Sequence, residues 1–147
     1  MGSNILEVND LKVHFPVKKG LFRRTAGFIK AVDGVTFNVK KGETLGLVGE
    51  SGCGKTTVGR SIVRLNSPQE GQILFNGENI LETKNTDLKQ MRRNVQIIFQ
   101  DPYSSLNPRH TIKSLIGEVL TVQMGYSKDE AAKETAELLK QVGLSPI

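Results

Sequence analysis

The chain has 147 residues, of which 37% are hydrophobic and 24% are charged, and its net charge is +5. This length suits one domain and is short for two, and no stretch approaches the roughly 18 consecutive apolar residues that a membrane-spanning helix needs. Six basic residues and no acidic residue lie between Leu11 and Val32, so the rest of the chain is nearly neutral. No helix-turn-helix, zinc-finger or aromatic RNA-binding pattern accompanies this cluster. We therefore expect a solvated loop and no nucleic-acid partner, while contact with anionic lipid or an acidic protein surface stays open.

The first forty residues alternate between apolar and polar side chains, as half-buried strands do. The apolar positions of the first segment are Leu6, Val8, Leu11, Val13 and Phe15, and those of the second are Val35, Phe37 and Val39. We predict an antiparallel β portion over residues 1–43. The basic residues 16–30, which include Gly and Pro, are predicted to form a long hairpin loop or insertion within it.

The segment from Thr44 to Val48 is apolar and predicts a buried strand, and Val58, Ile62 and Leu65 fall on one face of a following helix. Between the two, one stretch meets every position of the phosphate-binding pattern G-x-x-x-x-G-K-[ST]: Gly49-Glu50-Ser51-Gly52-Cys53-Gly54-Lys55-Thr56-Thr57. Its glycines can take positive φ and turn backbone N–H groups inward around an anion. A helix that begins near Lys55 adds its N-terminal N–H groups and its dipole. The sequence therefore predicts a nucleoside triphosphate site.

Within this stretch the residue types predict separate roles. Lys55 should reach the β- and γ-phosphates, the Thr56 hydroxyl should coordinate Mg²⁺, and Thr57 should make a further phosphate contact. Cys53 is the only cysteine, so an intrachain disulfide is impossible and a reducing, cytosolic compartment is expected. Its place beside a helix N-terminus predicts a thiol that reacts with maleimide and that ATP protects.

Further along the chain, Gln72–Phe75 predicts a strand that the Asn76-Gly77 turn closes, and Val95–Phe99 predicts another short strand. A loop rich in Pro, Ser and Asn follows from Asp101 to Pro108. The last third is predicted to be helical. One helix has its apolar face at Ile112, Leu115, Ile116, Val119 and Leu120, and the next begins with a Ser127–Glu130 capping box and ends at Gly143 and Pro146.

Two phrases and the basic insertion after Phe15 together resemble the ATP-binding subunits of ABC transporters, and within them the oligopeptide and dipeptide importers. The first phrase runs from Ala31-Val32-Asp33-Gly34 through Lys41-Gly42-Glu43 into the phosphate-binding stretch. The second is Ile97-Ile98-Phe99-Gln100-Asp101-Pro102 with Ser104-Ser105-Leu106-Asn107-Pro108-Arg109, which looks like the family's Q-loop. The similarity covers nearly the whole chain, and the second phrase is the more specific of the two.

The resemblance implies an α/β P-loop NTPase fold of the ABC ATPase type, with an N-terminal antiparallel β portion and a truncated α-helical subdomain. Residues 1–147 would form a single truncated nucleotide-binding domain, with a P-loop core over 44–100 and the start of the helical subdomain over 101–147. Gly49 to Thr57 would hold ATP and Mg²⁺. Gln100 would contact the metal or the attacking water and sense the membrane subunit. Phe15 would stack on adenine, with Phe28 as the second choice, although Phe15 also fits an ordinary core position of a strand.

The family's acidic strand end, its LSGGQ segment and its later His do not occur in these residues. We therefore expect the N-terminal part of a longer subunit, which binds ATP but hydrolyses it weakly or not at all, and whose phosphate-loop strand lacks its flanking strands. The parent would couple ATP hydrolysis to peptide import, with a second ATP-binding subunit and integral membrane permease subunits, on the cytoplasmic face of a bacterial membrane.

The alternative is a stand-alone small P-loop GTPase or kinase in which Asp101 ends the acidic strand. Gln100 interrupts that strand, Pro102 follows at once, and the chain has no Asn-Lys-x-Asp phrase for guanine.

Overall fold

The structure is a computed structural model, and it describes residues 3–20, 24–82, 85–101 and 106–145. The chain divides into two compact units, residues 1–97 and residues 98–147. The described part of the first unit contains an antiparallel sheet and the helices α1 and α2, and that of the second contains the helices α4 and α5. No helix in these described ranges combines the length and the apolar character that crossing a membrane requires.

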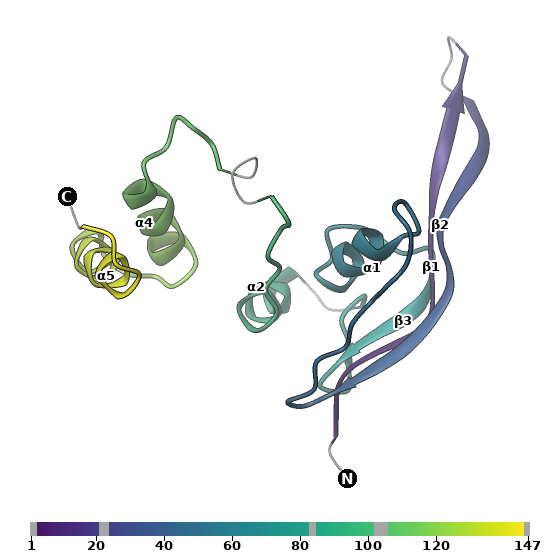
Figure 1. Ribbon diagram of the computed structural model, residues 1–147, viewed down its shortest axis with the longest axis horizontal. Coiled ribbons are helices and arrows are strands. Elements are labelled where there is room, and N and C mark those ends of the chain that lie inside the picture. Colours follow the sequence, from purple (N-terminus) through teal and green to yellow (C-terminus); the bar gives the residue numbers. More distant parts are fainter. Residues whose placement is uncertain (1–2, 21–23, 83–84, 102–105, 146–147) are drawn as a thin grey trace. The chain divides into compact units, whose positions relative to one another are not determined.

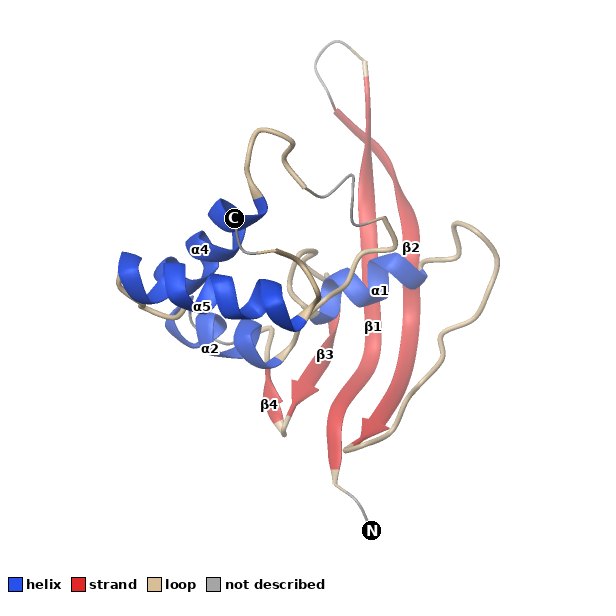
Figure 2. Cartoon of the chain, turned by 60° about the vertical axis from the view of Figure 1, so that its left-hand side comes forward, coloured by secondary structure: helices blue, strands red, loops and turns tan. Residues whose placement is uncertain are grey.

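The sheet of the first unit has the strand order β2-β1-β3-β4, and each neighbouring pair is antiparallel (Figure 1 for the first three strands, Figure 2 for all four). Its strands are β1 (Asn4–Lys19), β2 (Arg24–Lys40), β3 (Glu70–Phe75) and β4 (Glu78–Asn79). The alternation of the N-terminal residues predicted the β1–β2 pair correctly. The turn between β3 and β4 is also confirmed, since Asn76 and Gly77 both have positive φ, 51° and 83°, as a two-residue hairpin turn needs.

Helix α1 (Lys55–Ile62) packs on this sheet (Figure 2). Val58 of α1 is 3% exposed and belongs to the same buried cluster as residues of β1, β2 and β3. The buried members of the cluster are Val8, Leu11, Val13, Val32, Val58, Ile73, Ile80 and Met91. Met91 comes from α2 (Asn85–Asn94), a helix that the sequence analysis did not anticipate, because Leu88 and Met91 are the only apolar residues among its ten.

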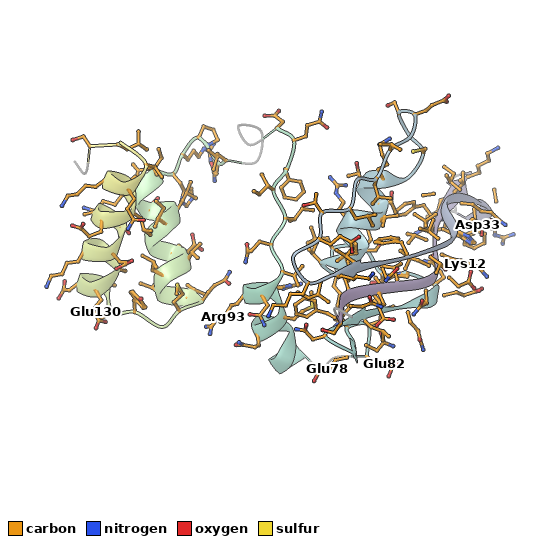
Figure 3. All side chains as sticks on the ribbon, turned by 60° about the horizontal axis from the view of Figure 1, so that its bottom comes forward. Lys12, Asp33, Glu78, Glu82, Arg93 and Glu130 are labelled. Atoms are coloured by element: carbon orange, nitrogen blue, oxygen red, sulfur yellow. The ribbon has the colours of Figure 1, made fainter. Side chains whose placement is uncertain are left out.

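Polar side chains link three strands of the sheet near the start of β3. Lys12 Nζ lies 2.6 Å from Glu70 Oε2, and this hydrogen bond lowers the pKa of the Glu70 carboxyl and raises that of the Lys12 ammonium. Asp33 accepts from Lys30 Nζ at 3.0 Å and lies 3.2 Å from His14 Nε2. The Lys30 hydrogen bond is the main reason that the pKa of Asp33 is lowered. Figure 3 shows Lys12 and Asp33 near each other, as their pairing across β1 and β2 requires.

Two predicted strands are wrong. Thr44–Val48 and Val95–Phe99 are irregular, with Leu47 45% exposed, Val48 92% and Ile98 94%. An extended segment becomes a strand only when a neighbour accepts and donates its backbone hydrogen bonds. No described strand pairs with either segment, and most of their apolar side chains are exposed, although Val95 packs against the core cluster and Ile97 is half-buried.

The basic residues 16–30 also differ from the prediction, because most of them are strand and not loop. The β1–β2 pairing continues through Val17↔Gly27 to Lys19↔Arg24, so residues 16–19 and 24–30 belong to strands. The helix after the loop is also shorter than predicted, because Leu65 was expected on its apolar face. Helix α1 ends at Ile62, Arg64 has a left-handed φ of 55°, and Leu65 is 55% exposed.

The second unit contains a helical hairpin. Helices α4 (Ile112–Val122) and α5 (Lys128–Gln141) pack together through Leu120, Ala131 and Leu139. The predicted capping box is confirmed: the Ser127 side chain accepts from the Glu130 N–H, and Glu130 Oε2 accepts from the Ser127 N–H at 2.9 Å. Gly143 has a φ of 76° where α5 ends, as predicted. Pro146 and residues 102–105 of the predicted loop lie outside the described residues.

Candidate functional site

The residues Gly49 to Gly54 form a loop that leads directly into α1. Gly52 and Gly54 have φ of 82° and 97°, which glycine adopts without strain. A Cβ on Gly54 would lie 2.2 Å from the Ala31 carbonyl oxygen of β2, and a Cβ on Gly49 would lie 2.7 Å from Cys53 Sγ. Glycine at 54 is therefore required by space as well as by dihedral angle, because the atom that it meets is backbone, whereas at Gly49 the nearest atom is a side-chain sulfur. At Gly54 the loop rests directly on the sheet.

The Lys55 side chain folds back into this loop. Its ammonium donates to the Gly49 carbonyl at 2.7 Å and to the Glu50 carbonyl at 2.6 Å, and it lies 3.3 Å from Cys53 Sγ. The loop is closed further by the Cys53 N–H, which donates to the Glu50 carbonyl at 3.3 Å. A positive charge is thus held at the centre of a ring of backbone, where a phosphate group would meet it.

The N-terminus of α1 supplies further donors at the same place. The Val58 N–H donates to the Gly54 carbonyl at 2.9 Å, so the N–H groups of Lys55, Thr56 and Thr57 precede the first intrahelical bond. Gly54 offers no side-chain cap, and the first turn contains no acidic residue. The positive end of the helix dipole is therefore uncompensated, which favours an anion.

A pocket of about 380 Å³ lies between β2 and the loop. Its lining combines the loop, apolar side chains and the Lys30–Asp33 ion pair of β2, and comprises Lys30, Ala31, Val32, Asp33, Val35, Leu47, Val48, Cys53, Gly54, Lys55 and Val58. The pocket therefore continues from the cationic loop towards apolar side chains. This combination suits a ligand that has an anionic end and a less polar end.

Cys53 is exposed and lies beside the Lys55 ammonium, whose hydrogen bond lowers the pKa of the thiol. A lowered pKa raises the thiolate fraction at neutral pH, which gives the predicted maleimide reactivity a physical basis. The thiol has no histidine beside it in the loop, so the site offers no base for nucleophilic catalysis at this position.

Thr56 is exposed in the first turn of α1, and Thr57 is half-buried. The described residues contain no group of three or more His, Cys, Asp or Glu that could enclose a metal by itself. A hydroxyl next to a phosphate site fits Mg²⁺, because this ion takes few protein ligands and completes its shell with phosphate oxygens and water.

The remaining predicted site residues are placed less centrally. Phe15 lies on β1 opposite Ile29 and is 42% exposed, so it is not the buried core residue of the alternative interpretation. Phe28, the second choice, lies opposite Pro16 and is 63% exposed. Gln100 is exposed and belongs to the second unit. The Ala31 carbonyl against Gly54 was missed, because a backbone contact between distant segments leaves no signal in residue types.

Comparison with known proteins agrees with this geometry. Residues 32–147 match the family described as ABC transporter. The chain is 52% identical over 143 residues to the oligopeptide transport ATP-binding protein AppF of Bacillus subtilis, which covers 97% of this chain and 44% of AppF. It is 47% identical to OppF of the same organism, another oligopeptide transport ATP-binding protein, over 99% of this chain and 46% of OppF. It is also 46% identical to the glutathione import ATP-binding protein GsiA of Pectobacterium atrosepticum, over 97% of this chain and 23% of GsiA.

Among solved structures, the dimeric ATP-binding cassette MJ0796 bound to ADP and Pi is similar with a TM-score of 0.72 and 25% identity, over 95% of this chain and 58% of that one. The predicted fold is thereby confirmed, and the stand-alone GTPase or kinase is not favoured. The chain spans less than half the length of the AppF and OppF proteins that it matches. On the family match over residues 32–147 and on the geometry of its phosphate loop, the chain belongs to the ABC transporter family.

Proposed function

We propose that this chain binds Mg-ATP through residues Gly49 to Thr57 as part of the ATP-binding subunit of a peptide importer. The observation that carries the proposal is the Lys55 ammonium, held by the Gly49 and Glu50 carbonyls at the centre of the loop and at the N-terminus of α1. Together with the glycines at 49 and 54, it supplies charge, donors and space for phosphates.

Each residue of the loop has a proposed task. Lys55 contacts the β- and γ-phosphates and is the catalytic cation, and the backbone N–H groups from Glu50 to Gly54 surround the phosphate oxygens. The hydroxyl of Thr56 would hold Mg²⁺, which would neutralise developing charge on the phosphates, and Thr57 contacts phosphate. Gln100 is proposed to orient water or metal, and residues 44–100 and 101–147 are proposed as core and helical subdomain.

The whole protein is proposed to hydrolyse ATP and to drive the import of a peptide. The names of AppF and OppF support this class of cargo, and the dimeric MJ0796 structure supports a second ATP-binding subunit as partner. Integral membrane permease subunits are the other proposed partners, which would place the chain on the cytoplasmic face of a bacterial membrane. Hydrolysis by these 147 residues alone is proposed to be weak or absent.

Calorimetric titration with Mg-ATP and Mg-GTP tests the binding proposal. We expect saturable Mg-ATP binding that Lys55→Ala weakens at least tenfold and that Lys41→Ala, an exposed lysine outside the loop, leaves unchanged. Equal Mg-ATP affinity of Lys55→Ala and of the unmutated 147-residue chain would contradict the assignment of Lys55 to the phosphates. A clear preference for GTP would revive the GTPase alternative. Steady phosphate release that depends on Lys55 would refute the weak-hydrolysis proposal.

The adenine contact is tested separately. Phe15→Ala should lower ATP affinity about tenfold, since base–aromatic stacking contributes about 1–3 kcal/mol, and Phe28→Ala should have the smaller effect. Inorganic triphosphate, which has no base, should bind both variants equally. The reverse order of the two phenylalanine variants would assign the stacking to Phe28.

A further inference from the structure

The hairpin of β1 and β2 continues beyond the rest of the sheet. Pairing between β1 and β3 ends at Lys12↔Glu70, whereas β1 and β2 pair on to Lys19↔Arg24 (Figure 1). We call the extension, residues 15–19 and 24–30, the hairpin arm. A two-stranded ribbon has no third strand to bury its side chains and is marginally stable by itself in water. The arm is therefore a candidate for stabilisation by something outside the chain.

The arm exposes large apolar side chains. Phe28 is 63% exposed, Ile29 is 60% exposed, and Phe15 opposite Ile29 is 42% exposed. Pro16, the partner of Phe28 across the ribbon, is exposed as well. Successive residues of a strand point to opposite faces, so Pro16 and Phe28 lie on one face of the arm and Phe15 and Ile29 on the other. Each face therefore carries one exposed apolar pair, and the pair with Phe28, the more exposed phenylalanine, is the candidate contact.

The same arm carries cations that nothing in the described chain neutralises. Lys18, Lys19 and Arg24 are exposed, and within the ranges that the structure describes none of them makes an ion pair. The register places Lys19 directly opposite Arg24, an arrangement that is unfavourable because like charges face each other. An anionic surface would remove that repulsion.

We propose that the hairpin arm docks on the anionic headgroups of a lipid bilayer. On the face that carries Pro16 and Phe28, an exposed aromatic side chain next to these cations fits the boundary between headgroups and acyl chains, where the cations meet phosphate while Phe28 enters the apolar layer. Phe15 lies on the opposite face, which leaves it available for the proposed adenine contact. An acidic protein surface would satisfy the cations but would leave Phe28 without an apolar environment. The combination of the two kinds of side chain therefore favours lipid, and this inference does not rest on the nucleotide site.

Sedimentation of the 147-residue chain with phosphatidylcholine vesicles, with and without 30% phosphatidylglycerol, tests the proposal. Binding is expected to require the anionic lipid and to weaken as salt rises. Lys18→Gln with Lys19→Gln should weaken it roughly 20-fold or more, at about fivefold per cation. The matched control is Lys40→Gln with Lys41→Gln, an equal charge change just where β2 ends, which should retain binding.

Two further measurements separate the apolar and electrostatic contributions. Phe28→Ser should weaken vesicle binding more than Val142→Ser, a 70% exposed apolar position in the second unit. Equal losses of vesicle binding from the Lys18/Lys19 and Lys40/Lys41 double variants would overturn the proposal, and so would no binding of the unmutated chain to anionic vesicles. Capture by soluble polyglutamate as strong as capture by vesicles, and unaffected by Phe28→Ser, would overturn it in favour of an acidic protein surface. Unchanged Mg-ATP affinity of the Lys18 and Lys19 variant would show that its fold is intact.

Discussion

Strand β1 and the segment Thr44–Val48 both contain Leu and Val, but the side chains of these residues have opposite environments. Val8 and Leu11 of β1 are fully buried, whereas Leu47 is 45% exposed and Val48 is 92% exposed. Strand β1 lies between β2 and β3 and is hydrogen-bonded on both sides. No described strand borders Thr44–Val48. The pattern of apolar residues therefore indicates which side chains can be buried, and the presence of neighbouring strands decides whether they are buried.

The largest expected contrast comes from truncating one leucine in each segment. Leu11→Ala should lower the free energy of unfolding of the first unit by about 3 kcal/mol, because it leaves a cavity between strands and α1. Leu47→Ala should lower it by about 0.5 kcal/mol or less, since little contact is lost. Urea denaturation followed by circular dichroism measures both. Similar losses would mean that Thr44–Val48 is as well packed as β1.

The loop after Thr44–Val48 touches the partnered sheet at Gly54, so the comparison can be sharpened there. Gly54→Ala combines a positive φ with a Cβ only 2.2 Å from the Ala31 carbonyl, and should destabilise the first unit by about 2 kcal/mol and lower ATP affinity at least tenfold. Gly52→Ala has a similar φ but nothing within 4 Å of the added Cβ, so about 1 kcal/mol is expected. Denaturation measures the stability of both variants and calorimetry their ATP affinity. A larger loss of stability in Gly52→Ala than in Gly54→Ala would contradict the role of the Ala31 contact.

The N-terminus of α5 is stabilised by residues close in sequence, so it isolates the contribution of local hydrogen bonds. Ser127→Ala should destabilise α5 by about 1 kcal/mol, because it removes the Ser127 side of the capping box. Hydrogen exchange of the first-turn amides of α5 measures the effect, with exposed Ser145→Ala as control. Protection that does not change would show that Glu130 alone caps the helix.

The smallest expected effect concerns the surface pairs of the sheet. Because the pKa of Glu70 is lowered in the folded state, its contribution to stability is present above its unfolded pKa of about 4.5 and is lost as the pH falls through the folded value. In Glu70→Gln the unfolding temperature should therefore fall less steeply as the pH is lowered, whereas Glu78→Gln on β4 should keep the slope of the unmutated chain. Thermal unfolding between pH 6 and pH 3 checks it, and an unchanged slope in Glu70→Gln would contradict the role of the Lys12 pair.

Much of the molecule could be predicted where the determinants are local. The alternation in β1 and β2, the Asn76-Gly77 turn, the Ser127–Glu130 capping box and the glycine spacing of the phosphate loop each act within a few residues. Thr44–Val48 and Val95–Phe99 were wrong because strand formation depends on neighbours that lie elsewhere in sequence. Helix α2 was missed because two apolar residues give no period, and the arm was missed because basic residues were taken to indicate a loop, although Val17, Thr25, Phe28 and Ile29 favour extended pairing.

The position of Lys55 has a consequence for how affinity should be interpreted. All three donors of its ammonium already have partners, two carbonyls and one sulfur, so a phosphate oxygen can reach it only by exchange and not by simple addition. The net gain from the contact is therefore the difference between two sets of bonds. Replacing Lys55 removes the hydrogen bonds that hold the Gly49 and Glu50 carbonyls as well as a ligand contact. The measured loss of ATP affinity will therefore include the conformational freedom that Gly49 and Glu50 gain.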